Sequence, residues 1–258
     1  MKSIEESVAT SMDCTDLGLL PYLPYILQDF WEIGASPEII LDIVRKHKRD
    51  YSFLKILDLG CGKGAVSIKL SSELKCHCLG IDAIIEFIDD ARRKAEENNI
   101  ESLCSFENND IRKRIVTLKD FDVIVLGAIG PVYGNYYDTL LKVSGCLKKD
   151  GIIIIDDGYI GDDKTFSHPL VEKKKDILFQ VKESGMKLID EVIVNQSDGK
   201  ANEQFDREYE YIVKRCNELI KKHPDDAPLF ENYISKQNEE YMILKNQIVC
   251  STMVFGKE

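Results

Sequence analysis

Three glycines alternate with other residues directly after a short aliphatic run that contains an aspartate. Residues 55–66 read KILDLGCGKGAV, and the glycines are Gly60, Gly62 and Gly64. A glycine has no β-carbon, so the main chain at these positions can approach a bound molecule closely and present backbone amides to it. The residue types and their spacing therefore predict that a ligand lies against this stretch.

The spacing of the glycines narrows the class of ligand. Dinucleotide sites have the order G-x-G-x-x-G, with the third glycine at the start of a helix. Here Ala65 occupies that position, and the glycines read G-x-G-x-G. Asp58 precedes the first glycine by two residues, and a carboxylate there is unfavourable beside a pyrophosphate but suits a cationic ligand. The glycines also fit a simple turn, so other residues have to support a binding site.

Two more carboxylates follow later strand-like runs at corresponding places. Asp82 ends the second run, and Asp110 follows the third. A vicinal diol is held well by one carboxylate that accepts two charge-assisted hydrogen bonds, which Asp82 can provide. Each aspartate has a structural alternative as a helix cap, because helices are expected from residues 84 and 111.

The elements that would position these residues alternate along the chain. Strands are predicted at about residues 54–59, 76–81, 103–108, 121–126, 151–156, 187–194 and 247–255. Helices are predicted at about residues 65–74, 84–98, 136–147 and 169–184, with a further helix that begins at Ser36 and Pro37. Runs such as DVIVLG and GIIIID are almost wholly aliphatic, as in parallel strands that are covered on both faces. The alternation predicts an α/β fold with a doubly wound, seven-stranded, mostly parallel sheet.

Two additions flank this predicted sheet. Residues 1–50 are expected to form an N-terminal helical segment that acts as a lid, and residues 51–258 the main domain. A charged helical insertion at about residues 196–246, broken by Pro224 and Pro228, separates the last two strands. Aromatic side chains in both additions either cover an acceptor cavity or simply pack at helical spacing. They are Tyr22, Tyr25, Phe30, Trp31, Tyr209, Tyr211, Phe230, Tyr233 and Tyr241.

With these residues in place, the sequence resembles the class I S-adenosylmethionine-dependent methyltransferases, in which an acid-x-G-x-G-x-G element follows the first strand. LDLGCGKG fits that element, and the likeness extends over about residues 54–156. The resemblance implies a Rossmann-like fold with S-adenosyl-L-methionine as methyl donor and S-adenosyl-L-homocysteine as product. It also implies a set of cofactor-binding residues: Asp58, Gly60, Cys61, Gly62, Gly64, Asp82, Ala83, Asn109, Asp110, Ile111, Gly127 and Ala128.

The resemblance also assigns individual roles. Asp82 would hold the two ribose hydroxyls. Asp110 would accept from the adenine amino group, and Ile111 would cover the adenine ring. Backbone carbonyls at Gly127, Ala128 and Ile129 would face the ammonium group of the methionine moiety.

The acceptor pocket of such a fold lies over the carboxyl ends of the fourth and fifth strands. In-line methyl transfer mainly needs alignment and exclusion of water, so a base is required only if the acceptor arrives protonated. Packing is the alternative for the tyrosines, and a loop cap is the alternative for the histidine. The candidates for catalytic work are Tyr133, Tyr136, Tyr137, Asp156, Asp157, Tyr159, His168 and Glu240.

Composition and motifs separate the possible acceptors. The chain of 258 residues has a formal net charge of -11, which opposes a broad nucleic-acid surface. The residues after the fourth strand match neither base-amino nor cytosine C5 methyltransferases, because Val132 rather than cysteine follows Pro131. Asp156 and Asp157 partly resemble the metal ligands of catechol-type enzymes. Gly127 stands in place of their first ligand, so no metal site is expected.

A small-molecule methyltransferase is therefore favoured. An RNA or protein methyltransferase is the first alternative, and a nucleotide-dependent reductase or a non-catalytic cofactor-binding module is the second. The polar N-terminus and the lack of any apolar run of membrane-spanning length predict a cytoplasmic protein without a membrane partner. The eight cysteines are scattered, which predicts reduced thiols, and Cys76 and Cys78 are expected on the opposite strand face from His77. The sequence carries no signal for an oligomeric state.

Overall fold

Seven strands form one sheet in the computed structural model, which describes residues 2–194 and 199–258 but not the side chains of 199–202 and 204. The strand order is β3-β2-β1-β4-β5-β7-β6, and β7 runs antiparallel to both of its neighbours. This confirms the predicted doubly wound, mostly parallel sheet. The strands are β1 (Lys55–Leu59), β2 (His77–Asp82), β3 (Cys104–Asn108), β4 (Phe121–Gly127), β5 (Leu147–Ile160), β6 (Met186–Ile193) and β7 (Ile248–Lys257).

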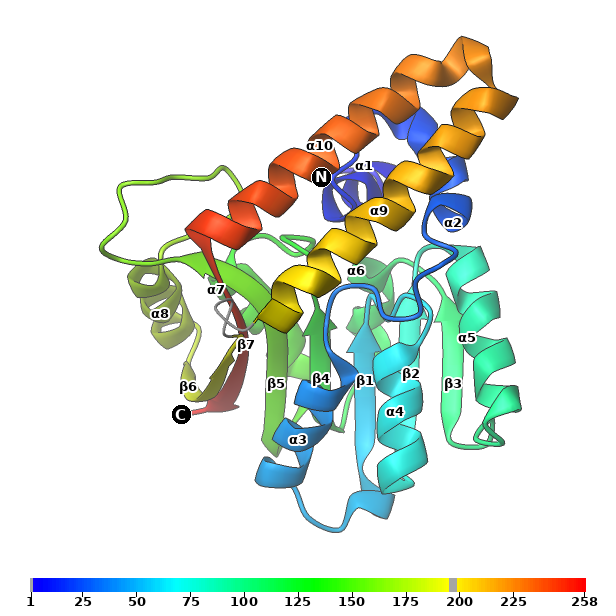
Figure 1. The fold of residues 1–258 in the computed structure, drawn as a ribbon. Coiled ribbons are helices and arrows are strands. Elements are labelled where there is room, and N and C mark those ends of the chain that lie inside the picture. Colours follow the sequence, from blue (N-terminus) through cyan, green and yellow to red (C-terminus); the bar gives the residue numbers. More distant parts are fainter. Residues whose placement is uncertain (1, 195–198) are drawn as a thin grey trace.

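Helices cover both faces of the sheet (Figure 1). One face is covered by α3 (Pro37–His47), α4 (Ala65–Leu74) and α5 (Ile85–Glu97), and the other by α6 (Ile111–Arg114), α7 (Tyr136–Val143) and α8 (Lys174–Glu183). Successive strand residues point to opposite faces. Ile56 and Leu57, which are both fully buried, therefore belong to two different apolar clusters. This double burial explains why the central strands are almost wholly aliphatic.

A third layer lies above the carboxyl ends of the parallel strands (Figure 1). It consists of α1 (Ile4–Ser11), the 3₁₀ helix Leu17–Tyr22, α2 (Leu23–Ile26), and the long antiparallel pair α9 (Gly199–Lys222) and α10 (Ala227–Gln247). The ring centroids of Tyr22 and Phe230 are 5.0 Å apart, and those of Phe30 and Tyr211 are 6.0 Å apart. Aromatic residues of the two additions therefore pack against each other, which was one of the two alternatives for them.

Several predicted features differ from the structure. β5 continues to Ile160 because it pairs with β7 along its whole second half. α8 begins only at Lys174, since the preceding segment is extended and the Glu172 carbonyl accepts a hydrogen bond from the Ile160 N–H. Pro228 lies in the first turn of α10, where a helix tolerates proline, instead of breaking a helix. The part of the predicted insertion at residues 196–198 lies outside the described residues.

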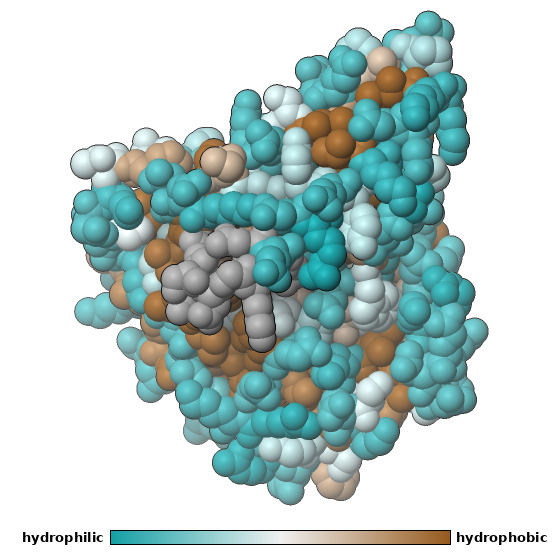
Figure 2. All heavy atoms as spheres, viewed as in Figure 1, coloured by the Kyte–Doolittle hydropathy of each residue, from teal (hydrophilic) through white to brown (hydrophobic). Residues whose placement is uncertain are grey.

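The surface facing the viewer in Figure 2 is mostly hydrophilic, with hydrophobic side chains showing along the α9–α10 pair. Among the described helices, none combines the length and apolar character needed to span a membrane. All eight cysteines lie in the described part of the chain, and none of them forms a disulfide bond. The sulfur atoms of Cys76 and Cys78 lie 3.9 Å apart in the core, and His77 is exposed, as their predicted positions on opposite strand faces require.

Candidate functional site

A cavity of about 90 Å³ lies at the carboxyl ends of β1, β2, β3 and β4. It is formed where the glycine loop, the end of β2, the start of α6 and the end of β4 meet. Most residues predicted to bind a cofactor line it, although they come from four separate segments of the chain. They are Gly60, Gly62, Asp82, Ala83, Asn109, Asp110, Ile111, Gly127 and Ala128.

Asp82 is held at the centre of this cavity by backbone amides. Its Oδ2 accepts from the N–H of Gly62 and its Oδ1 from the N–H of Ile84, each at 2.9 Å. The side chain is 8% exposed, and burial raises the pKa of Asp82 despite these hydrogen bonds. Each carboxylate oxygen has a second lone pair. Asp82 can therefore serve the loop and still accept hydrogen bonds from a ligand diol.

Gly62 and Gly64 lack side chains for different reasons, although both have a positive φ. A β-carbon on Gly62, at φ 51°, would find its nearest neighbour, Ile33, at 3.9 Å, so space remains towards the cavity. A β-carbon on Gly64, at φ 78°, would lie 2.8 Å from the ring of Phe106 and 2.9 Å from Ala91. Close packing within the protein thus explains Gly64, whereas Gly62 leaves room for a ligand.

Asp58, Cys61 and Gly64 are not among the residues that line this cavity. Asp58 is 3% exposed and accepts a hydrogen bond of 2.7 Å from the hydroxyl of Ser67 in α4. Burial, together with the nearby charge of Asp82, raises the pKa of Asp58 to about 6. The structure therefore shows Asp58 joining β1 to α4, and its contact with a cofactor stays a prediction.

Asp110 is both the predicted adenine-binding acid and the N-cap of α6. Its Oδ1 accepts from the backbone N–H of Arg112 at 3.0 Å and from Arg112 Nε at 2.9 Å, and its Oδ2 accepts from Nη2 at 2.9 Å. These bonds with Arg112 hold the pKa of Asp110 below its usual range. The carboxylate therefore stays ionised and fixed in direction at the cavity wall.

The outer wall of the cavity comes from residues that sequence reasoning missed. They are Ile4, Ser7, Val8 and Ser11 of α1, together with Met12, Ile33, Ile84, Arg112 and Val132. α1 has a capping box, in which Ser3 and Glu6 each bond the other's backbone N–H, and this S-x-x-E pattern is visible in the sequence. It would have predicted the helix, but not its position over the site.

Two contacts fix α1 in that position. Arg112 Nη1 donates to the hydroxyl of Ser7 at 2.8 Å and to the carbonyl of Lys2 at 2.9 Å. Ser11 donates to the carbonyl of Ile129, just beyond β4, at 2.6 Å. The helix is thus tied to both the adenine side and the β4 side of the predicted site.

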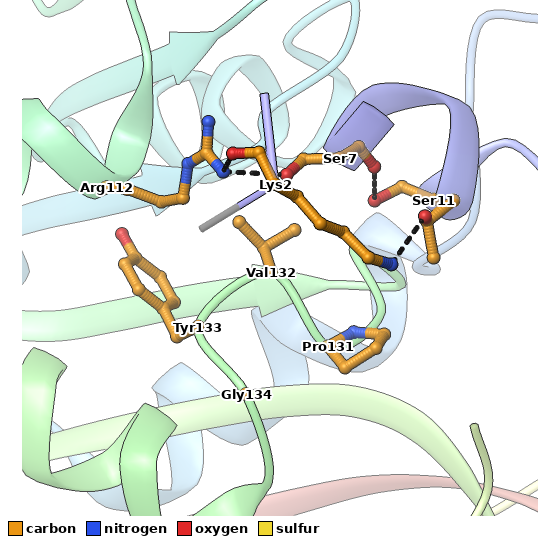
Figure 3. A pocket seen from close by; sticks show the side chains of 9 residues that line it. Lys2, Ser7, Ser11, Arg112, Pro131, Val132, Tyr133 and Gly134 are labelled. Carbon is orange, nitrogen blue, oxygen red and sulfur yellow. Dashed lines mark hydrogen bonds between the residues drawn. The ribbon is translucent and has the colours of Figure 1, made fainter. Parts of the chain in front are cut away.

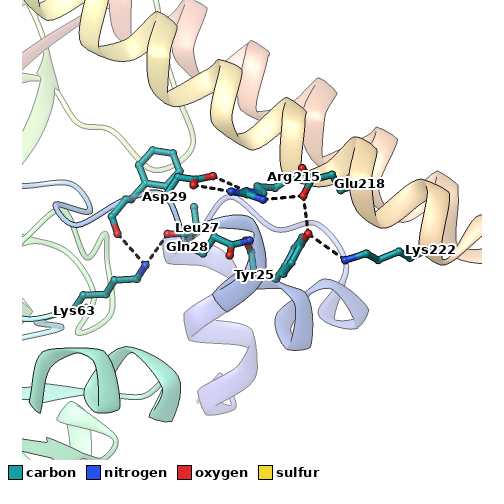
Figure 4. A network of polar contacts seen from close by, with 9 residues as sticks. Tyr25, Leu27, Gln28, Asp29, Lys63, Arg215, Glu218 and Lys222 are labelled. Atoms are coloured by element: carbon teal, nitrogen blue, oxygen red, sulfur yellow. Dashed lines mark hydrogen bonds and ion pairs between the residues drawn. The ribbon is translucent and has the colours of Figure 1, made fainter. Parts of the chain in front are cut away.

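Lys63, inside the glycine motif, is another residue that the sequence did not single out. It is 4% exposed, and its ammonium donates to the carbonyls of Leu27 and Phe30 at 2.7 and 2.9 Å. Figure 4 shows how the same segment continues to α9, where Arg215 bonds Asp29. The glycine loop, the N-terminal segment and the insertion therefore form one connected unit.

Most of the acceptor-site candidates lie away from the described cavities. Asp156 accepts from the buried hydroxyl of Thr252, and Tyr136 donates to Asp157 at 3.4 Å. Asp157 is an exposed residue by its total surface. Desolvation of its carboxyl by the surrounding residues raises the pKa of that carboxyl to about 6. Tyr159 faces Lys174, whose ammonium lies 4.9 Å from its ring centre.

Tyr133 differs from these candidates because it lines a second cavity, of about 190 Å³, which adjoins the first. Its hydroxyl donates to the carbonyl of Ile111 at 3.0 Å, and burial raises its pKa. Tyr133 therefore keeps its proton and forms a wall of this cavity. Tyr137 is exposed on α7.

His168 and Glu240, proposed separately as bases, face each other. His168 Nε2 lies 3.9 Å from Glu240 Oε2, and the N–H of Leu170 donates to Nδ1 at 3.3 Å. Lys236 bonds the other Glu240 oxygen at 2.6 Å. Both ring nitrogens thus have protein neighbours, and neither residue lines a described cavity, so a role as base stays a prediction. Within the described chain, no group of three or more His, Cys, Asp or Glu residues could hold a metal ion.

The sequence of this chain is similar to the sequences of methyltransferases. Residues 51–247 match a family model described as a methyltransferase domain. The ubiquinone biosynthesis O-methyltransferase of Rickettsia bellii is 31% identical over 119 residues, which are 45% of this chain and 47% of that protein. The ribosomal protein L11 methyltransferase of Dictyoglomus turgidum is 28% identical over 158 residues, 61% of this chain and 46% of that protein. The chain thus spans about half the length of the curated relatives it matches.

A crystal structure of a SAM-dependent methyltransferase from Geobacter sulfurreducens, in complex with S-adenosyl-L-homocysteine, has the same fold. Its TM-score with this chain is 0.75 at 16% identity, over 92% of this chain and 98% of that one. At this level of identity, the similarity establishes the arrangement of the sheet and its helices.

Proposed function

This chain belongs to the methyltransferase family, and from that membership we propose that it transfers a methyl group from S-adenosylmethionine to a small-molecule acceptor. The observation that carries the proposal is the pairing of Asp82 with Gly62 at one cavity. A buried carboxylate at the end of β2 is fixed by the amide of a glycine whose missing side chain leaves room for a ligand. An adenosyl ligand with a vicinal diol and a cationic tail matches that pair.

The residues around the cavity fit such a ligand in chemistry. Asp82 has free lone pairs for two hydroxyls, and Asp110 is an ionised acceptor fixed by Arg112. The apolar side chain of Ile111 also lines the cavity, where it can cover a flat ring. The present volume of about 90 Å³ is below the roughly 300 Å³ typical of small ligand sites. Four of the lining residues belong to α1, so an outward shift of α1 on binding would enlarge the cavity.

When bound, S-adenosylmethionine supplies a methyl group on a sulfonium, which an acceptor lone pair can displace in line. The residues of this chain would align the two molecules and exclude water. α1, which Ser7 and Ser11 hold in place, would cover one side of the bound molecules, and the glycine loop would cover the other. Lys63 keeps that loop attached to the N-terminal segment.

The size of the neighbouring cavity supports a small acceptor. Its volume of about 190 Å³ equals that of roughly six water molecules, so it accommodates a small organic group. The similarity to a ubiquinone biosynthesis O-methyltransferase also favours this class. A protein acceptor is the alternative, and the similarity to a ribosomal protein L11 methyltransferase favours it.

Calorimetric titration of the purified protein with S-adenosylhomocysteine, and separately with NADH, tests the cofactor assignment. We expect saturable binding of the first compound at micromolar concentrations and no heat from the second. Binding of NADH alone would replace the methyltransferase proposal with a reductase.

A labelling experiment tests the acceptor class. The protein is incubated with methyl-labelled S-adenosylmethionine and, in parallel, with a metabolite extract, total protein or total RNA. We expect label in the metabolite extract. Label confined to protein or RNA would transfer the proposal to the corresponding macromolecular acceptor.

A further inference from the structure

The cavity next to the cofactor site is lined by cations and hydroxyl groups. Figure 3 shows Lys2, Ser7 and Ser11 of the N-terminal segment facing Arg112, Tyr133 and the Pro131–Gly134 turn across it. Ser7, Ser11, Arg112 and Val132 also line the cofactor cavity. A molecule in the second cavity would therefore lie directly against the first.

The charge on the wall of this cavity is positive. Arg112 is paired with Asp110, so the two side chains together are neutral. Lys2 donates to the hydroxyl of Thr10 at 3.0 Å and forms no ion pair among the described residues. Of the two cationic side chains on this wall, Lys2 is therefore the one without a carboxylate partner among the described residues, in a chain whose formal net charge is -11. A cation without a carboxylate partner makes the potential at this wall locally positive in an otherwise acidic protein, which favours an anionic ligand.

The hydrogen-bonding groups have the same preference. The Ser7 hydroxyl accepts from Arg112 Nη1 and keeps its own proton for a ligand, whereas the Thr10 and Ser11 hydroxyls donate to the carbonyls of Glu6 and Ile129. Among the described residues that line the cavity, none is a carboxylate or a histidine. A methyl acceptor that carries a neutral hydroxyl would thus find no base in this cavity, whereas an acceptor whose oxygen is already ionised needs no base.

We propose that this second cavity binds the anionic group of the methyl acceptor, a carboxylate or a phosphate on a small organic molecule. Lys2 supplies the charge, and the hydroxyl of Ser7 supplies a hydrogen bond. This inference rests on the proposed methyltransferase function and specifies its substrate class. Because Lys2 and Ser7 belong to the segment that covers the cofactor cavity, acceptor binding and closure of α1 would support each other.

Anion exchange separates this inference from the proposed function. A metabolite extract is divided into a fraction retained on an anion-exchange resin at pH 8 and an unretained fraction before the reaction. Each fraction is incubated with the full chain and methyl-labelled S-adenosylmethionine. We expect label only from the retained fraction. Treating that fraction with phosphatase first would abolish labelling if the anion is a phosphate and leave it unchanged if the anion is a carboxylate.

The site itself is tested by Lys2→Gln with Lys113→Gln as its control, because Lys113 is an exposed neighbour of Arg112 that does not line the cavity. Removing a charged partner should raise the half-saturating amount of the retained fraction about tenfold in Lys2→Gln. Lys2→Arg should restore it. The calorimetric affinity for S-adenosylhomocysteine should be the same in all three variants.

The possible failures have different meanings. Label from the unretained fraction would overturn the anionic acceptor and leave small-molecule methylation standing. Absence of label from both fractions, with S-adenosylhomocysteine still bound, would contradict the small-molecule acceptor and this inference together. Equal half-saturation in Lys2→Gln and Lys113→Gln would show that the anion binds elsewhere. A parallel loss of S-adenosylhomocysteine affinity in Lys2→Gln would assign Lys2 to the cofactor cavity instead.

Discussion

The carboxylate of Asp82 and the backbone amide of Gly62 are joined by a hydrogen bond of 2.9 Å across the turn from β1 to α4. The other Asp82 oxygen accepts from Ile84, at the start of α5. One side chain therefore fixes the glycine loop relative to the end of β2. The structural and the ligand-binding interpretations of Asp82 are compatible, because the same orientation serves both.

Replacing Asp82 by asparagine should weaken S-adenosylhomocysteine binding about tenfold or more. The amide keeps one acceptor oxygen but loses the charge that strengthens hydrogen bonds to hydroxyls, a loss of about 1.5–3 kcal/mol. Isothermal calorimetry measures it. Asp89→Asn is the control, because Asp89 lies on α5 with a side chain that is 64% exposed. Unchanged affinity in Asp82→Asn would remove this carboxylate from the site.

Lys63→Met should lower the free energy of unfolding by about 2 kcal/mol. The variant keeps most of the apolar stem but leaves the carbonyls of Leu27 and Phe30 without their buried donor. Urea denaturation measures the loss. Hydrogen exchange should also show faster opening of residues 23–30, because the contact joins them to the glycine loop.

Lys69→Met provides the comparison for Lys63. Lys69 is on α4, and its side chain is 33% exposed with ion pairs to Glu38 and Glu73 of 3.3 and 3.9 Å. Such exposed pairs contribute little, so this variant should lose less than about 1 kcal/mol. Equal losses in the two variants would contradict a special role for Lys63.

The sequence predicted those parts of the fold that depend on local patterns. α4 spans the predicted residues, because a glycine at its N-cap and an apolar face define it locally. Asp82 and Asp110 could be placed at one edge because parallel strands end on the same side of a sheet. The start of α8 was predicted too early, since a tertiary bridge between Ile160 and Lys173 holds the preceding segment extended.

What could not be predicted depends on contacts between distant segments. The capping box of Ser3 and Glu6 specifies a helix, but its place over the cavity depends on Arg112 and Ile129, more than a hundred residues away. Lys63 reads as an ordinary exposed residue in a loop until the 27–30 segment is seen to surround it. No local pattern contains that information.

Gly64→Ala should destabilise the protein more than Gly185→Ala. Both glycines have φ near +75°, so both variants lose about 1 kcal/mol or more from backbone strain. A β-carbon on Gly185 meets nothing within 4 Å, whereas one on Gly64 would overlap Phe106 and Ala91. Overpacking should add about 1–3 kcal/mol to the Gly64 variant in urea denaturation. Equal effects would mean that strain alone selects glycine there.

The ionisation of Asp58 should leave a signature in the pH dependence of stability. Asp58 is buried, and its pKa is raised to about 6 in the folded protein, compared with about 3.9 in an unfolded chain. Between these values the native state binds more protons than the unfolded state. The contribution of Asp58 to stability is therefore complete below about pH 4 and is lost as the pH rises through about 6.

Asp58→Asn removes this titration but can keep the acceptor for the Ser67 hydroxyl. Between pH 4 and 7, the free energy of unfolding of the variant should therefore rise relative to that of the parent protein. The rise should be roughly 3 kcal/mol if the whole pKa difference is expressed. Taking the difference between the two proteins cancels the titrating groups that the substitution leaves unchanged. Asp42→Asn, with a side chain that is 80% exposed, controls for the loss of one surface charge and should show a flat difference. Urea denaturation of all three proteins at several pH values measures these differences in unfolding free energy. If the difference for Asp58→Asn also did not change with pH, Asp58 would ionise in the folded protein as easily as in the unfolded chain.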